Sequence, residues 1–105
     1  MELETFDALA TALAGVTRTR GAGLARWSCR GRLVARELDA SHVVVRVPFD
    51  VRDLLLRQYP EVFSVPRRFA KHMMVVADLT AGDDGAVEEA VTAAWRLQSE
   101  GADGA

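Results

Sequence analysis

The first part of the chain has the spacing of an amphipathic helix. Its apolar positions are three or four residues apart and comprise Leu3, Phe6, Leu9, Leu13 and Val16. That spacing places them on one helical face, and the acids in the first turn suit the positive end of the helix dipole. The pattern predicts a helix that ends near Gly15, followed by a flexible basic loop over residues 18–23.

The centre of the chain changes to the alternation of strands. Segments 24–29 and 33–38 flank the sequence RGR, which predicts a hairpin with Gly31 at a positive φ. We expect a three-residue loop that pairs Cys29 with Leu33, because a shorter loop mixes arginines with the apolar face. The face expected to be buried then carries Ala25, Trp27, Cys29, Leu33 and Ala35.

A third strand is predicted to follow the turn at residues 40–42. Its buried face carries Val43, Val45 and Val47. A short helix comes next, with Asp50 as the expected N-cap and Pro60 as its stop. Its buried side is expected to comprise Val51, Leu54, Leu55 and Tyr59.

The last third of the chain predicts two strands and a helix. Residues 61–65 are interpreted as a short edge strand, and residues 73–79 as an apolar strand buried on parts of both faces. Asp84 is the expected cap of the final helix. The buried positions of this helix are Val87, Val91, Ala94 and Leu97 or Gln98, with Trp95 at the flank.

This order of elements predicts a fold class. A strand-rich centre between terminal helices favours an α+β two-layer sandwich, with an antiparallel sheet covered on one face. The length of 105 residues suits one domain, expected over 1–99, and residues 100–105 read as a frayed tail.

Composition narrows the function classes. The net charge is −2, which is not the balance of a strongly nucleic-acid-binding chain. Cys29 is the only cysteine, and no Cys/His cluster has zinc spacing, so neither a disulfide nor a metal is expected. No paired carboxylates or nucleophile–base motif indicate an enzyme, and no cofactor motif is found. The acidic N-terminus and the lack of a long apolar run favour a cytoplasmic protein with no membrane role.

Charge is distributed in blocks. The first 15 residues hold acids and no cation, and the segment from Met73 onward holds seven acids against Arg96. Two basic blocks lie between them. The candidate anion-binding residues drawn from these blocks and the neighbouring strand are Arg18, Arg20, Arg26, Arg36, Arg46, Arg67, Arg68, Lys71 and His72. The competing interpretation is a solvated face whose cations pair with nearby acids.

Several local patterns together resemble the MmcQ/YjbR-like family. They are ALAGV at the end of the first helix, WSCRGRLVA in the hairpin, RDLLLRQYPEVFSVPRRFAKHMMVVADL and AVEEAVTAAWRLQ. Ala14 stands where the family usually has proline, and Met73 where tryptophan usually follows the histidine. The resemblance implies a sandwich related to the CyaY-like fold. The family has no established biochemical activity, and its members are described as candidate DNA-binding proteins.

The sequence therefore predicts weak binding of nucleic acid or another polyanion through the basic sheet face and the loop RRFAKH. An alternative is a protein-interaction module or homodimer, in which the basic residues of one copy meet the acidic C-terminal helix of another. A third interpretation is a binder of a small acidic ligand at the sheet edge.

Overall fold

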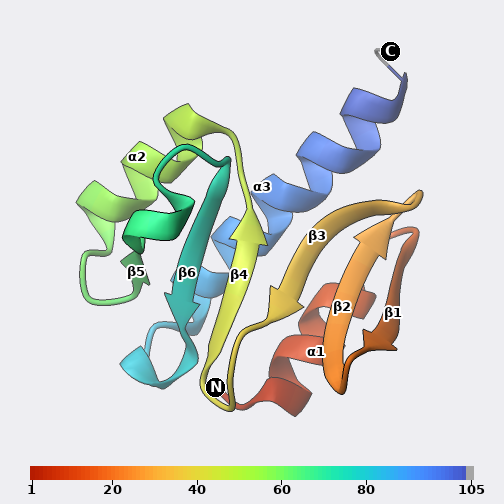
Figure 1. Cartoon of the computed structure of the whole chain (residues 1–105), viewed down its shortest axis with the longest axis horizontal. Helices are drawn as coiled ribbons and strands as arrows, with labels where there is room; N and C mark the ends of the chain where they lie inside the picture. The colour runs from red at the N-terminus through yellow and green to blue at the C-terminus, as the bar shows by residue number, and fades with distance from the viewer. Residues whose placement is uncertain (104–105) are drawn as a thin grey trace.

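The chain forms a single antiparallel sheet with helices packed on it (Figure 1). The computed structural model describes the backbone of residues 1–103 and the side chains of residues 1–100. The sheet has six strands in the order β1-β2-β3-β4-β6-β5. The strands are β1 (Val16–Gly21), β2 (Leu24–Cys29), β3 (Arg32–Glu37), β4 (His42–Arg46), β5 (Phe63–Ser64) and β6 (Met74–Asp78). The helices are α1 (Leu3–Thr11), α2 (Phe49–Gln58) and α3 (Asp84–Asp103), with short 3₁₀ turns η1 (Arg67–Phe69) and η2 (Leu79–Ala81).

The helices define the two sides of the sheet. Helices α1 and α3 cover one face, and α2 packs against α3, β5 and β6 at one end of the sheet (Figure 1). The turn η1 lies over part of the opposite side of the sheet, which is here called the open face. The predicted α+β two-layer sandwich, with an antiparallel sheet and helices at both ends of the chain, is confirmed.

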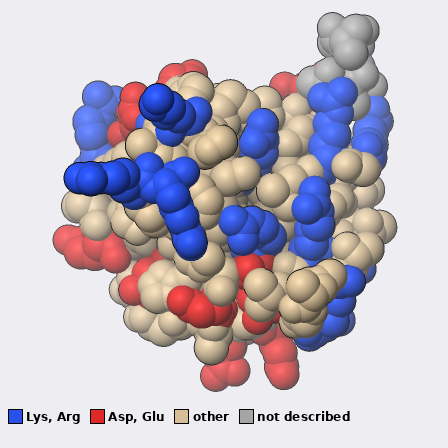
Figure 2. Space-filling view, in the orientation of Figure 1, with Lys and Arg blue, Asp and Glu red and all other residues tan. Residues whose placement is uncertain are grey.

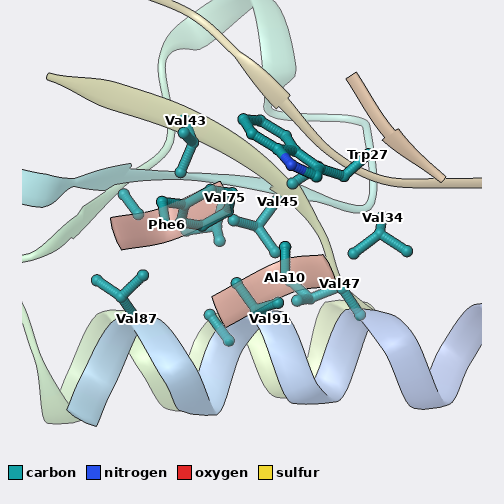
Figure 3. Packing of buried hydrophobic residues seen from close by; sticks show 14 of the residues in the cluster. Phe6, Ala10, Trp27, Val34, Val43, Val45, Val47, Val75, Val87 and Val91 are labelled. Atoms are coloured by element: carbon teal, nitrogen blue, oxygen red, sulfur yellow. The ribbon is translucent and has the colours of Figure 1, made fainter. Parts of the chain in front are cut away.

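The core lies between the sheet and helices α1 and α3 (Figure 3). Val43, Val45 and Val47 are fully buried on the helix side, as their alternation predicts. The rings of Phe6 and Trp27 pack edge to face, with centroids 4.8 Å apart and planes at 74°. Each such buried apolar side chain stabilises the fold by about 1.5–3 kcal/mol, so this layer fixes which face of the sheet is left open.

The N-terminal prediction is wrong in two respects. Helix α1 ends at Thr11, and Val16 opens strand β1, where it is buried against the core. The expected loop over residues 18–23 is mostly strand, because the β1–β2 connection needs only Ala22 and Gly23, both at positive φ. The other residues of β1 are exposed, so this edge strand carries no apolar alternation to reveal it.

The β2–β3 hairpin has a shorter turn than predicted. Arg30 and Gly31, both at positive φ, form a two-residue turn, so that Cys29 pairs with Arg32 and not with Leu33. A register shift after Trp27 restores its predicted pairing with Ala35. The shift leaves Leu33 only half-buried. Val34, expected on the exposed face, is fully buried in the core.

Four helix details also differ from the sequence predictions. Pro48, in extended conformation, precedes α2, so the predicted N-cap Asp50 lies in the first turn, and Leu54 is exposed while Leu55 is buried. Asp83, not Asp84, caps α3, since its Oδ1 accepts the N–H of Ala86 at 3.0 Å. Of the tail predicted over 100–105, the part up to residue 103 is helical, and 104–105 lie outside the described residues.

The remaining strand and helix predictions hold. β5 is an edge strand, and β6 is buried on both faces, with Val75 in the main core and Val76 in a smaller cluster on the open face. Val87, Val91 and Ala94 form the buried side of α3. Gln98 is also buried, and its Nε2 donates to the carbonyl oxygen of Leu33 at 2.6 Å, which ties the end of α3 to β3.

Candidate anion-binding face

Three arginines of the open face come from adjacent strands. Arg26 lies between the inward-facing Ala25 and Trp27, so strand alternation turns it outward. Arg36 pairs directly with Arg26 across the β2–β3 ladder, as predicted. Arg46 lies on β4, two residues beyond the partner of Arg36. Like charges directly opposite each other destabilise a sheet by a few tenths of a kcal/mol, and a bound anion would relieve this repulsion.

The turn η1 is anchored on the open face by Phe69. This ring is 8% exposed and packs with Val44 and Val76 in the smaller apolar cluster. The guanidinium carbons of Arg36 and Arg68 lie 5.6 Å and 4.8 Å from the ring centroid. Phe69 therefore joins the strand arginines to the loop, and its buried ring is not available to stack on a nucleic-acid base.

The basic loop is held in place by Arg52, a residue that the sequence did not single out. Its Nη1 donates to the carbonyl oxygens of Ala70 and His72, at 3.1 Å and 2.9 Å. Its guanidinium carbon lies 4.8 Å from the ring centroid of Phe49. Arg52 thus fixes the end of the loop by bonds to its backbone. The loop side chains that remain exposed to solvent are Arg67, Arg68, Lys71 and His72.

The cations of the open face lack acidic partners among the side chains that the structure describes. Among the residues whose side chains the structure describes, no ion pair involves Arg26, Arg36, Arg46, Arg67, Arg68 or Lys71. Figure 2 shows Lys and Arg side chains across the middle and upper parts of this side of the molecule, with acids mostly along its lower edge. The competing interpretation, in which the cations of this face pair with nearby acids, thus has no ion pair to support it among the described residues.

Arg18 and Arg20 do not join this group. They share a face with the buried Val16 and so lie on the α1 side of the sheet, where they line a hollow that also contains three acidic residues. Arg18 pairs with Asp7, at 3.3 Å between Nη1 and Oδ2. Asp7 also accepts the indole N–H of Trp27 at 2.8 Å, so this carboxylate is part of the α1–sheet contact.

A cleft opens beside the strand arginines, where β3 and β4 diverge. The two strands pair only along residues 35–37 and 43–45, and α3 passes behind the gap between them (Figure 1). This fork cleft has a volume of about 500 Å³ and is lined by Arg26, Arg32, Leu33, Arg46, Met73, Leu97 and Gln98. Arg32 was missed as a site residue because the three-residue turn expected from the sequence placed it inside the loop. The sequence alone could have indicated it through the alternative two-residue turn.

The other chemically active side chains lie elsewhere or are enclosed. Nδ1 of His42 is 2.9 Å from Oδ1 of Asp39. The pKa of Asp39 is lowered mainly by a hydrogen bond from the backbone N–H of Ser41 and, to a smaller extent, by the hydrogen bond with His42. Cys29 is buried. Within the described residues, no group of three or more His, Cys, Asp or Glu side chains is arranged to hold a metal ion.

The fold and the surface together define a small α+β sandwich protein with a basic open face. Comparison with family models, with curated proteins and with solved structures found no match for the chain. The resemblance to the MmcQ/YjbR-like family therefore stays a prediction. No helix among the described residues is long and apolar enough to cross a membrane.

Proposed function

We propose that the open face of the protein binds nucleic acid by contacts to the phosphate backbone of the nucleic acid. The observation that carries the proposal is the set of cations on this side that have no acidic partner among the described side chains. Guanidinium groups bind phosphate oxygens with charge-assisted hydrogen bonds. The resemblance to a family of candidate DNA-binding proteins points in the same direction.

Binding of this kind is weak and insensitive to sequence. Phosphate contacts position a protein on nucleic acid without reading its bases, and Phe69, the aromatic residue of the loop, is already packed against the sheet. Each phosphate contact contributes a slope of about −0.9 to log K against log salt on duplex DNA. If four of the unpaired cations contact phosphates, the slope is about −3.6, and affinity falls steeply with added salt.

Two double variants with the same change in charge test the proposal. In Arg67→Gln/Arg68→Gln the cations are removed from the open face, and in Arg18→Gln/Arg20→Gln they are removed from the α1 side. Binding of a fluorescent duplex and of a single strand is measured by anisotropy at low and moderate salt. We expect the first variant to bind at least about tenfold more weakly and with a reduced salt slope, while the second binds as the original protein does.

Either of two results would count against nucleic-acid binding. One is an absence of salt-dependent binding by the original protein at low salt. The other is an equal loss of affinity in the two variants, since only the first changes the open face. Sedimentation of the protein alone tests the homodimer alternative, which predicts a stable dimer that is indifferent to DNA.

A further inference from the structure

The fork cleft is lined by several hydrogen-bond donors and by no acidic side chain. Its seven lining residues include Arg26, Arg32 and Arg46, from three different strands, and no Asp or Glu. These arginines make no ion pair with the described side chains. Arg32 and Arg26 are exposed and Arg46 is half-buried, so their guanidinium groups are accessible from solvent.

The framework around the cleft is fixed by the fold. The floor at α3 is held to β3 by the 2.6 Å hydrogen bond from Gln98 to the carbonyl of Leu33. The two-residue turn next to Arg32 fixes the backbone position of this arginine, since it pairs with the buried Cys29. On the other side, Arg46 pairs with Met74 in the centre of the sheet. The three arginines therefore start from positions set by ordered backbone.

We propose that the fork cleft binds a phosphate monoester, which carries about −1.5 to −2 charges at neutral pH. Three guanidinium groups match that charge better than the single charge of an internal phosphodiester, and each can donate two hydrogen bonds to phosphate oxygens. The apolar side chains of Leu33, Met73 and Leu97 supply a wall for the organic group attached to the phosphate. A volume of about 500 Å³ lies within the range of small-molecule sites.

The inference rests on the proposed function in part, because Arg26 and Arg46 belong both to the open face and to the cleft. Arg32 lies in the cleft and is not among the residues assigned to nucleic-acid binding. The phosphate monoester could belong to a small molecule or to the 5′ end of a nucleic-acid strand, and both sources present the same chemical group to the cleft.

The test follows the amide signals of the protein by NMR during titration with ribose 5-phosphate, with ribose as the neutral control. We expect saturable shifts of the Gln98 side-chain amide and the Leu33 backbone amide with the phosphate only. Arg32→Gln should weaken this binding at least about tenfold, since it removes charge-assisted hydrogen bonds to the phosphate. Arg32→Lys keeps the charge but cannot donate two parallel hydrogen bonds to the phosphate, so its affinity should lie between those of the original protein and Arg32→Gln.

A second comparison identifies the source of the phosphate and separates the two proposals. A short single strand with a 5′-phosphate is compared with the same strand bearing a 5′-hydroxyl. Preference for the phosphorylated strand, lost in Arg32→Gln, indicates a strand end, and equal binding of the strands indicates a small-molecule ligand. Arg67→Gln should weaken duplex binding and leave ribose 5-phosphate binding unchanged. Equal shifts with ribose and ribose 5-phosphate, or unchanged binding in Arg32→Gln, would overturn the inference even if duplex binding is retained.

Discussion

Replacing Phe69 by alanine tests whether one ring holds the basic turn on the sheet. Phe69 is 8% exposed and packs on Val44 and Val76, with Arg36 and Arg68 against its ring. Truncation of a buried phenylalanine costs about 3–5 kcal/mol. The site borders solvent, so water can enter the space that is left, and we take about 2–3 kcal/mol for lost burial. The two cation–π contacts add about 0.5–1 kcal/mol each.

The expected loss for Phe69→Ala is therefore about 3–5 kcal/mol in the free energy of unfolding. Phe69→Leu is the matched control, because it keeps most of the apolar volume and loses only the ring contacts. Its expected loss is about 1–2 kcal/mol. Neither loss exceeds the stability of a typical domain, about 5–15 kcal/mol, so both variants should still fold at room temperature.

The assay is urea unfolding followed by tryptophan fluorescence, for which the buried Trp27 is a built-in probe. With a slope of about 1.5 kcal/mol per molar urea, Phe69→Ala should lower the midpoint by roughly 2–3.3 M. It should also weaken duplex binding, because Arg67, Arg68 and Lys71 lose their fixed position. A midpoint within 0.3 M of the original protein, taking about 0.5 kcal/mol as the scale of neutral surface changes, would refute the view that this ring anchors the turn.

Two further predictions concern polar contacts of the scaffold. Arg52→Met removes both hydrogen bonds to the loop carbonyls and should lower the free energy of unfolding by about 1–2 kcal/mol, a modest loss because water can bond to the exposed carbonyls. Faster amide exchange confined to residues 67–73 in this variant would confirm that Arg52 holds the loop, and unchanged exchange would contradict it. Asp78 accepts from the hydroxyl and the backbone N–H of Thr80, which lower its pKa from 3.8. A carboxyl group whose pKa is lowered by folding stabilises the protein at pH values above its ordinary pKa, and this stability is lost as the pH falls through the pKa of the folded state. Asp78→Ala should therefore be less stable by about 1 kcal/mol at neutral pH, and its difference in stability from the original protein should close below pH 3.8. A stability difference that is constant with pH would contradict this account.

The sequence determined the fold class and the buried faces of the central elements. The valines of β4 alternate and the apolar positions of α3 recur with helical spacing, and both patterns describe burial that is periodic along a single segment. The same alternation predicted that Arg26 and Arg36 lie on the exposed side of the sheet. Such local patterns survive folding because each side chain's direction is set by its own backbone conformation.

Only the tertiary structure decided how the cations are grouped. β1 is an edge strand with almost no apolar residues, so its existence depends on pairing with β2, and that pairing turns Arg18 and Arg20 toward α1. The two-residue turn of the β2–β3 hairpin makes Arg32 the first residue of β3, where it lines the cleft. These features depend on hydrogen bonds between segments and on the packing of Phe69 against the sheet, and no periodicity within one segment encodes such contacts.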